Sequence, residues 1–454
     1  MVVSDRRILA AALVAWFAVG VLALASGPPL GHDEAAYAVA ARGDAPAWNY
    51  RSTGMVAIAR VGVALGGSEL ALRAVALVLG AGVLVGGFAL GKAAFDPRTG
   101  AWAALVLATA HPMATRSAEL IGDLPATACL LGGVAVLIGE LELSRPRWRL
   151  VGAAPLFAAA FYIRYGSAPV IGMIAVLAVV FYARKLACLP VLATVVLAAL
   201  LVVPHVVHSV ETTGSPLGIL TASASMPRRA YVGEGLVTYV TSNPVRFYGA
   251  LVAPVMIAGL VTLARSRRRA PWFVVLLALG QVVSLGIESH AQPRYVFFAT
   301  ALLVVAGVDV LRRLDRPKLA GARIAAVACG LAWLGLAIGI VPFQRYLTDL
   351  RRPLYTMAAA VRDDAKGRPC AIAANVAPQL IWATHCAVII AKTAAKLPAP
   401  WPPAARVKYV VSAPHAVVSP SQLQAVAATA QAVPHELAVA SPGSPEARAW
   451  RLDL

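Results

Sequence analysis

Charged residues are scarce in this sequence. Only 13% of its 454 residues are Asp, Glu, Lys or Arg, about half the share of roughly 25% that soluble domains carry. Hydrophobic residues make up 59% of the chain, and they recur in runs near the length of roughly 20 residues that crosses a bilayer as a helix. A soluble globular protein is therefore excluded, and the sequence predicts an all-α polytopic membrane protein.

Acidic residues are especially few, with 21 Asp and Glu against 40 Lys and Arg and a net charge of +19. A charge of this size can indicate nucleic-acid binding. Here, however, the basic residues fall in short loops on one side when the apolar spans alternate across the membrane, which is the pattern of cytoplasmic loops. We therefore expect no nucleic-acid partner. The basic clusters lie at residues 6–7, 92–98, 145–149, 184–185, 265–269 and 312–318.

Cysteine is rare as well, with five in the chain, and no Cys-x-x-Cys or Cys/His zinc spacing occurs. Cys129, Cys188 and Cys329 fall in apolar spans, where cysteine serves as a small buried side chain. Cys370 and Cys386 lie in a polar segment that the topology places outside the cytoplasm, where disulfides persist. These two cysteines are the candidate disulfide.

The apolar runs predict about eleven transmembrane helices. Residues 1–25 resemble a secretory signal peptide, but more such runs follow, so we interpret them as an uncleaved first helix with its N-terminus inside. This interpretation places residues 1–342 in the cytoplasmic membrane, with outer loops at 26–66 and 209–246. The predicted spans are 8–25, 69–91, 101–115, 123–141, 150–163, 167–183, 188–208, 247–264, 272–288, 294–311 and 321–342.

Residues 343–454 are more polar and contain no full span. Strands are predicted at 370–374, 386–390 and 408–412, and helices at 378–385 and 421–432. This alternation predicts a small α/β domain, and the order of spans places it outside.

Two adjacent acids occupy the first outer loop, where residues 31–37 read Gly-His-Asp-Glu-Ala-Ala-Tyr. A carboxylate at a membrane surface can take a proton from an attacking hydroxyl, so Asp33 and Glu34 are candidate catalytic residues. The alternative is that both acids stabilise the N-terminus of the helix that follows. Asp123, at the outer end of another span, is a third candidate. The alternative for Asp123 is likewise that it stabilises the N-terminus of a helix, whose first turn contains Pro125.

Three arginines lie at the outer ends of spans, where few cations are expected. Arg51, Arg164 and Arg294 are suited to a lipid phosphate, which lies at this depth and which guanidinium binds through paired hydrogen bonds. His290 and Tyr295 flank Arg294 and complete the candidate substrate-binding set. The alternative is that the arginines only extend their head groups into the membrane interface.

One histidine pair is a candidate for a divalent metal. His205 and His208 lie three residues apart near an outer helix end, with Glu211 one turn further on, and imidazole and carboxylate are common metal ligands. Polar residues at a helix end explain the pair more simply. We therefore expect no cofactor, with a divalent ion as the alternative.

Four motifs carry a family resemblance. They are residues 32–37, His-Asp-Glu-Ala-Ala-Tyr; 66–73, Gly-Gly-Ser-Glu-Leu-Ala-Leu-Arg; 117–125, Ser-Ala-Glu-Leu-Ile-Gly-Asp-Leu-Pro; and 290–295, His-Ala-Gln-Pro-Arg-Tyr. In this order they resemble the GT-C superfamily of membrane glycosyltransferases. The resemblance is to the branch of protein O-mannosyltransferases and of bacterial enzymes that transfer aminoarabinose or galacturonic acid to lipopolysaccharide. It runs through most of residues 1–310.

The resemblance implies roles for the candidate residues. Asp33 would activate or position the acceptor, with Glu34 in support, and Asp123 would be the second acidic residue of the site. Arg164 lies where relatives carry a Lys or Arg near the lipid phosphate. Arg51 falls where many relatives have Lys-Pro-Pro, and here the cation is kept without the prolines.

The resemblance predicts an enzyme that moves a hexose or pentose from a polyprenyl-phosphate donor to a glycolipid, polysaccharide or protein outside the cytoplasm. No nucleotide-binding domain is needed, because nucleotide sugars are not available there. The competing prediction is a transporter or flippase for lipid-linked or anionic substrates. Transporters place charges near the midplane, often on repeated halves. Here the charges gather at one face and no repeat is visible, which favours the enzyme.

Overall fold

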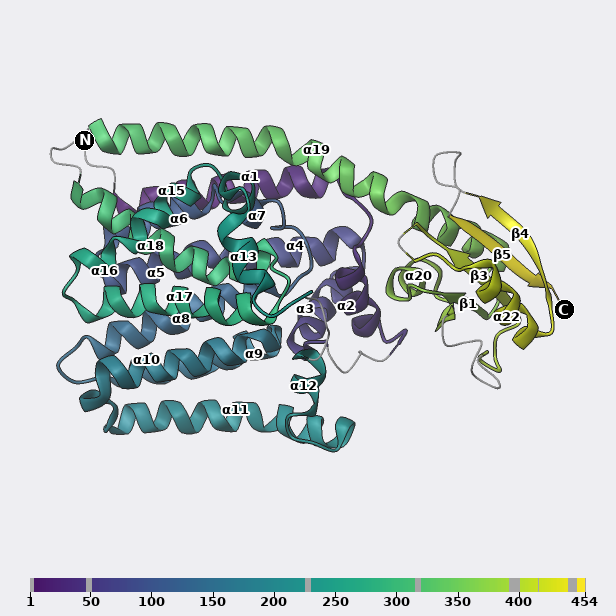
Figure 1. The fold of residues 1–454 in the computed structure, drawn as a ribbon, viewed down its shortest axis with the longest axis horizontal. Coiled ribbons are helices and arrows are strands. Elements are labelled where there is room, and N and C mark those ends of the chain that lie inside the picture. The colour runs from purple at the N-terminus through teal and green to yellow at the C-terminus, as the bar shows by residue number, and fades with distance from the viewer. Residues whose placement is uncertain are drawn as a thin grey trace. The chain divides into compact units, whose positions relative to one another are not determined.

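The computed structural model describes residues 4–45, 51–224, 230–314, 320–391, 401–414, 416–439 and 447–453. The chain forms two compact units. Unit 1 comprises Met1–Ala25, Trp48–Met55 and Arg73–Val341, and unit 2 comprises Ser26–Ala47, Val56–Leu72 and Pro342–Leu454. Unit 1 is a bundle of helices, and unit 2 holds the β-sheet (Figure 1).

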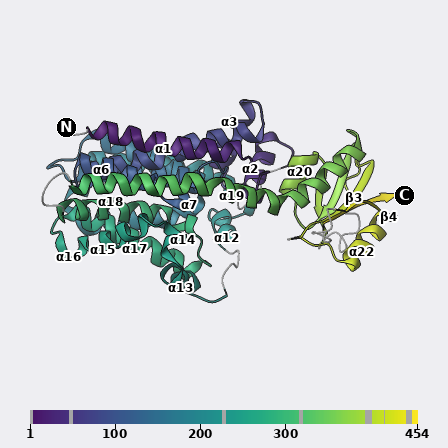
Figure 2. The same ribbon diagram turned by 90° about the horizontal axis from the view of Figure 1, so that it is seen from above.

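Unit 1 is built of long apolar helices that run side by side (Figures 1 and 2). Helix is the expected form, because backbone groups in a bilayer must bond within their own segment. The helices are α1 (Asp5–Ala25), most of α4 (Glu69–Gly80), α5 (Gly82–Ala94), α6 (Pro97–Leu107), α7 (His111–Ala114), α8 (Asp123–Leu141), η1 (Trp148–Gly152), α9 (Ala153–Ile163), η2 (Tyr165–Ser167), α10 (Ala168–Leu186), α11 (Leu189–Thr213), α12 (Gly218–Ala224), α13 (Glu234–Thr241), α14 (Pro244–Tyr248), α15 (Val252–Leu260), α16 (Thr262–Arg265), α17 (Arg269–Glu288), η3 (Pro293–Val296), α18 (Phe297–Leu314) and the first part of α19 (Ala320–Ala365).

Eight helical segments among the described residues are long and apolar enough to cross a membrane. They coincide with eight of the predicted spans, and the span predicted at 123–141 has the bounds of α8. The other three are shorter: α6 has 11 residues, and the remaining two are the apolar stretches Trp148–Ile163 and Val252–Arg265. The multi-pass helical fold is thus confirmed, whereas the count of eleven is not. Helix breaks shorten these three segments, and apolar composition alone does not reveal a break.

Helices α5 and α6 pack through glycine. A Cβ atom on Gly91 would lie 2.4 Å from the Cα atom of Gly100, so the two backbones can approach this closely only because neither residue has a side chain. Small residues at such crossings let van der Waals packing hold helices together inside a membrane, where the hydrophobic effect cannot. On α1, the buried Trp16 donates its indole N–H to the carbonyl oxygen of Leu77 at 3.3 Å.

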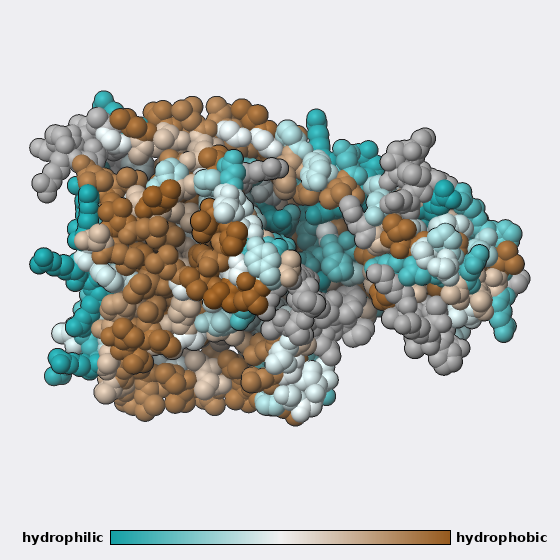
Figure 3. Space-filling model, viewed as in Figure 1, coloured by the Kyte–Doolittle hydropathy of each residue, from teal (hydrophilic) through white to brown (hydrophobic). Residues whose placement is uncertain are grey.

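The outward faces of unit 1 are apolar. Hydrophobic side chains cover the helices, and hydrophilic side chains gather at one end of the bundle (Figure 3). On α11, Leu192, Val195 and Leu200 are 58%, 60% and 61% exposed. An apolar surface of this extent is solvated by lipid rather than by water. Unit 1 is therefore an integral, multi-pass membrane structure.

Unit 2 contains a five-stranded sheet of strand order β2-β1-β3-β5-β4. Strand β1 pairs in parallel with β2 and β3, whereas β5 pairs antiparallel with β3 and β4. The elements of this unit are α2 (His32–Arg42), most of α3 (Thr53–Ala64), the second part of α19, β1 (Cys370–Ala374), α20 (Pro378–Thr384), β2 (Ala387–Ile390), β3 (Val407–Ser412), α22 (Pro420–Ala430), β4 (Val433–Val439) and β5 (Arg448–Asp453).

The small α/β domain is confirmed, and its three predicted strands and two predicted helices are present as β1, β2, β3, α20 and α22. Strands β4 and β5 were not predicted. In β4 the residues Pro434, His435 and Glu436 interrupt the apolar pattern, and in β5 the charges of Arg448 and Arg451 do the same. Both strands lie at one side of the sheet, where alternate side chains face water.

Each face of the sheet has its own core. Ile372 and Tyr409 pack on one face with Val361 from α19. Ala373 and Val410, their neighbours in sequence, pack on the other face with residues of α22. Successive side chains of a strand point to opposite faces, so the apolar β1 and β3 strands need a helix on each side. This requirement explains why β1 is apolar throughout and why β3 is apolar apart from Lys408 and Ser412.

The candidate disulfide between Cys370 and Cys386 is present, with the two sulfur atoms 2.11 Å apart. It joins the start of β1 to the residue before β2 and so encloses α20. Replacing both cysteines with serine is expected to lower the local stability of the sheet by about 3 kcal/mol, the entropy of closing a loop of this length. Hydrogen exchange of the β1 and β3 amides in the full chain measures this loss. Reductant should bring the wild type to the level of the double mutant, and equal protection under oxidising conditions would contradict the prediction.

Candidate active site

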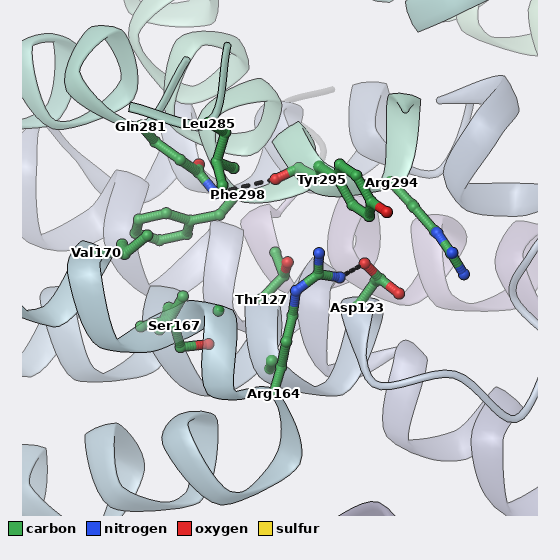
Figure 4. A pocket seen from close by; sticks show the side chains of 13 residues that line it. Asp123, Thr127, Arg164, Ser167, Val170, Gln281, Leu285, Arg294, Tyr295 and Phe298 are labelled. Carbon is green, nitrogen blue, oxygen red and sulfur yellow. Dashed lines mark hydrogen bonds and ion pairs between the residues drawn. The ribbon is translucent and has the colours of Figure 1, made fainter. Parts of the chain in front are cut away.

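An acid and a base from two different helices meet in unit 1. Asp123 is the first residue of α8 and is only 6% exposed. Its carboxylate forms an ion pair with the guanidinium of Arg164, through Oδ1 and Nη1 (Figure 4). Arg164 ends α9 in an extended conformation, with φ −151° and ψ 109°. The chain therefore leaves the helix at this residue.

The close approach of these two segments depends on Gly122. A Cβ atom at this position would lie 2.6 Å from the carbonyl oxygen of Ile163, a backbone atom that cannot rotate away. Gly122→Ala is therefore expected to push the start of α8 away from Arg164 and to lower the free energy of unfolding by about 1–3 kcal/mol, as overpacking does. Thermal unfolding in detergent measures the effect. Gly172→Ala is the matched control, because a Cβ there meets nothing within 4 Å, and an equal change in both variants would refute the role of Gly122.

Tyr295 lies between two arginines. Its ring centroid is 5.0 Å from the Arg164 Cζ and 5.5 Å from the Arg294 Cζ, within the range of cation–π attraction. Arg294 also donates its Nε–H to the side-chain oxygen of Gln292 at 2.7 Å. His290 meets the Tyr295 ring edge-on, with the centroids 5.9 Å apart. The structure thus brings three of the predicted residues together around the ring of a fourth, Tyr295.

A small cleft lies beside the ion pair, bounded by α8, α10, α17 and the start of α18 (Figure 4). Asp123, Arg164, Arg294 and Tyr295 line it together with the polar side chains of Thr127 and Ser167, among others. Its volume is 20 Å³, which is room for about one water molecule. A sugar phosphate therefore needs the cleft to open, and the Arg164–Asp123 pair is part of the wall that would have to move.

Gln281 also lines the cleft, and the sequence analysis missed it. It lies in the apolar helix α17 and is 5% exposed. Its amide Nε2 donates to the carbonyl oxygen of Tyr295 at 3.1 Å, and its Oε1 has no hydrogen-bond partner within the described part of the chain. A lone amide in a membrane helix marks a functional position by default. That signal was available in the sequence.

Tyr239 adds a hydroxyl close to this group from the short helix α13. Burial raises the pKa of Tyr239 above its ordinary value, although the positive charge of Arg164 acts in the opposite direction. The phenol therefore stays protonated at neutral pH and can donate a hydrogen bond.

Arg51 also belongs to unit 1, in the turn before α3, but it is not among the residues that line the cleft.

In unit 2, Glu34 holds the start of α2. Its Oε2 accepts the backbone N–H of Gly31, the residue before the helix, at 2.7 Å and lies 3.3 Å from Nη1 of Arg351. Glu34 is 2% exposed, so this carboxylate is enclosed by its own helix start and by α19. Its neighbour Asp33 is half-buried in the first turn of α2. The capping alternative therefore applies to Glu34, and Asp33 is the acid with more access to solvent.

The α/β domain contacts α2 directly, within unit 2 (Figures 1 and 2). The guanidinium of Arg42 lies over the ring of Trp382 on α20, with its Cζ 4.2 Å from the ring centroid. The indole N–H of Trp382 donates to Oε1 of Glu69 at 3.2 Å. Gln379, also on α20, lies 3.4 Å from the ring nitrogen Nδ1 of His32. The helix that carries Asp33 is thus fixed by α20.

The two histidines on α11 do not form a metal site with Glu211. His205 is 2% exposed and is surrounded by the rings of Phe161 and Tyr165, at centroid distances of 4.8 Å and 4.9 Å. His208 is exposed. Within the described ranges, no group of three His, Cys, Asp or Glu side chains is arranged to hold a metal ion.

Comparison with known proteins identifies the fold. Residues 52–208 match the model of the dolichyl-phosphate-mannose-protein mannosyltransferase family. A search of curated proteins gives no match. The solved structures that are similar at low sequence identity include three from different organisms. They are ArnT of Cupriavidus metallidurans bound to undecaprenyl phosphate (TM-score 0.72, 14% identity, 98% of this chain and 97% of that one), the Archaeoglobus fulgidus oligosaccharyltransferase tethered to an acceptor peptide (0.62, 12%, 98% and 74%), and the mycobacterial arabinofuranosyltransferase AftD (0.57, 13%, 100% and 40%).

The similarities to these three structures extend over nearly the whole of this chain, and so include both the helical bundle and the C-terminal sheet, whereas the family model matches residues 52–208 only. Three of the four motifs that predicted the superfamily fall at the start of α2, at the start of α8 and in η3, where candidate residues described above are found, and the fourth, residues 66–73, leads into α4. The chain has the fold of the GT-C membrane glycosyltransferases.

Proposed function

We propose that this protein transfers a sugar from a polyprenyl-phosphate donor to an acceptor outside the cytoplasm. The observation that carries the proposal is the ion pair between Arg164 and Asp123 at the wall of a cleft that Arg294 and Tyr295 also line. A transporter would need its charges near the membrane midplane. Here the charges lie at helix ends, at the start of α8 and at the end of α9.

The donor phosphate is assigned to the two arginines. Guanidinium binds phosphate through two parallel hydrogen bonds, and Arg164 and Arg294 flank the same aromatic ring. The ArnT structure contains undecaprenyl phosphate, and an oligosaccharyltransferase structure from Archaeoglobus fulgidus contains dolichol-phosphate. Those ligands belong to those proteins, and their chemistry supports a lipid phosphate as the ligand here.

Donor binding would open the ion pair. An incoming phosphate competes with Asp123 for the guanidinium of Arg164, because both are anions and both accept its forked hydrogen bonds. The carboxylate released in this way can then accept a hydrogen bond from a sugar hydroxyl. The cleft, with room for about one water molecule now, would widen in the same movement. Gln281 and the protonated Tyr239 supply further neutral hydrogen-bond partners for the sugar.

Asp33 is assigned to the acceptor. In the transfer step the acceptor oxygen forms a bond to the anomeric carbon, and the bond from that carbon to the phosphate oxygen breaks. The proton of the acceptor hydroxyl passes to the Asp33 carboxylate, and the polyprenyl phosphate leaves as an anion stabilised by arginine. Attack opposite the leaving group inverts the anomeric configuration. Glu34 acts through α2, by keeping the first turn of that helix in place.

The orientation follows from charge. The end of the bundle that carries the basic loops faces the cytoplasm by the positive-inside rule, so the candidate residues at the opposite helix ends face outward. We accordingly place the protein in the cytoplasmic membrane with the α/β domain outside, acting on a glycolipid, polysaccharide or protein.

A transfer assay with defined donors tests the proposal. Purified protein in lipid vesicles is given radiolabelled polyprenyl-phosphate hexoses and pentoses, one at a time, with an extract of envelope lipids, polysaccharides and proteins as acceptors. Label that moves to one acceptor class identifies both donor and acceptor. Absence of transfer from every donor, together with movement of a labelled lipid across the vesicle membrane, would overturn the enzyme in favour of a flippase.

A further inference from the structure

A second cavity of unit 1 lies away from the candidate active site. Four helices, α6, α15, α18 and α19, enclose a volume of 520 Å³. Along α6 the lining residues are Arg98, Trp102 and Val106, and along α19 they include Ala325 and Cys329. Each set is spaced by four residues, so one continuous stripe of each helix faces the cavity. We call this cavity the α6–α19 groove.

One end of the groove is basic. Arg98 and Arg312 line that end, and the walls beyond them are apolar. Arg312 donates from Nη1 to both carboxylate oxygens of Asp96, at 2.7 Å and 3.0 Å, and also to Thr99. These contacts all use one nitrogen of the guanidinium, and the side chain is 31% exposed. Two arginines against one aspartate leave this end with a net positive charge.

The length of the groove matches one leaflet. From Arg98 to Val106, α6 advances eight residues and so spans about 12 Å at a rise of 1.5 Å per residue. Half of a hydrocarbon core is roughly 15 Å thick. Water does not fill a cavity with such walls, because a buried water molecule needs several polar partners. An acyl chain fits both the depth and the polarity of the groove.

We propose that the α6–α19 groove binds one anionic phospholipid from the leaflet at the basic end of the bundle. Its phosphate meets Arg98 and the outer edge of Arg312, and an acyl chain lies against Trp102 and fills the space beside α19. The site is separate from the donor cleft. Phe298 lines that cleft and Arg312 lines the groove, and these two residues of α18 are about 21 Å apart along the helix.

Native mass spectrometry of the detergent-solubilised full chain tests the site. The protein is titrated with phosphatidylglycerol and with phosphatidylcholine of the same acyl chains. We expect one molecule of phosphatidylglycerol to bind, with at least about fivefold preference over phosphatidylcholine, since one arginine near an anionic head group contributes about that factor. The proposal does not rest on glycosyl transfer, and the readout does not depend on activity.

Three variants locate the lipid. Arg98→Gln is expected to weaken phosphatidylglycerol binding by at least about fivefold, and Arg98 is exposed, so this change leaves the fold intact. Ala325→Trp keeps every charge but fills the groove, and should abolish binding of both lipids. Arg184→Gln removes an exposed charge from the last turn of α10, outside the groove, and should change nothing.

Several outcomes would overturn the proposal. Equal binding of the two lipids would remove the arginines from recognition. A loss with Arg184→Gln as large as that with Arg98→Gln would indicate diffuse surface charge. Unchanged binding in Ala325→Trp would place the lipid elsewhere. One-for-one displacement of phosphatidylglycerol by polyprenyl phosphate would make the groove a donor-tail site instead.

Discussion

Arg164→Gln is expected to reduce sugar transfer by roughly 10²–10³-fold, the effect of removing one preorganised group that stabilises developing negative charge. The same variant should bind polyprenyl phosphate more weakly, because the phosphate loses a forked hydrogen-bond donor. Arg164→Lys keeps the charge without the fork and should retain an intermediate activity. The assay is the transfer of labelled sugar, combined with titration of unlabelled polyprenyl phosphate as a competitor.

The single variant has a structural side effect that needs a control. Without Arg164, the buried Asp123 carboxylate loses its partner, and an unpaired buried charge destabilises a protein by about 3–5 kcal/mol. The double variant Arg164→Gln with Asp123→Asn replaces the ion pair by two neutral amides of similar size and should restore stability. It should remain inactive. Recovery of transfer in the double variant would show that Arg164 only neutralises Asp123, and would refute its role toward the donor.

Asp33→Asn is expected to lower the turnover rate by roughly 10²–10⁴-fold, the usual contribution of a positioned general base. Thermal stability should be nearly unchanged, because asparagine has the same shape and also favours the start of a helix. Asp349→Asn is the matched control in the same unit, since Asp349 is 64% exposed and pairs only with Arg352 among the described contacts. Transfer by Asp33→Asn within a factor of three of wild type would remove Asp33 from the mechanism.

Glu34→Ala is expected to lower stability rather than turnover rate, the reverse of Asp33→Asn, so the two variants distinguish the roles of the two acids. Glu34→Ala removes the acceptor of the Gly31 N–H and the ion-pair partner of Arg351, and is expected to lower the free energy of unfolding by about 2 kcal/mol. The protein that remains folded should keep most of its turnover rate. A loss of rate without a loss of stability would return Glu34 to a direct catalytic role.

The fold was largely readable from the sequence because its signals are periodic and local. Long apolar runs gave the transmembrane helices, and the short runs of β1 and β3 gave two strands that are buried on both faces. The number of spans is not confirmed, since a break such as the one between α15 and α16 at Val261 interrupts an apolar run without changing its composition. Strand β4 was not predicted because its composition is not that of a buried strand: it contains polar residues and Pro434, which an edge strand tolerates.

The candidate site was predicted as a set of residues but not as a set of contacts. Asp123 and Arg164 were both named, yet nothing local indicates that the glycine before Asp123 allows α8 to approach Ile163 closely enough to pair them. Glu34 was read with its neighbour Asp33, whereas its ion-pair partner, Arg351, is 317 residues away in sequence. Tertiary packing determines which residues form such pairs, and local patterns in a single sequence do not reveal it.

The contact between α2 and α20 also sets an order of folding. Arg42 donates to the carbonyl oxygen of Trp382 across 340 residues of chain, and closing a loop of that length is entropically unfavourable until other structure has formed. Because the ribosome releases the chain from its N-terminus, α2 must wait for α20 to be synthesised and enclosed by its disulfide before the two helices can pack. The helix that carries Asp33 would therefore be made early and secured late, so that a partly synthesised chain contains Asp33 without the contacts that fix its helix.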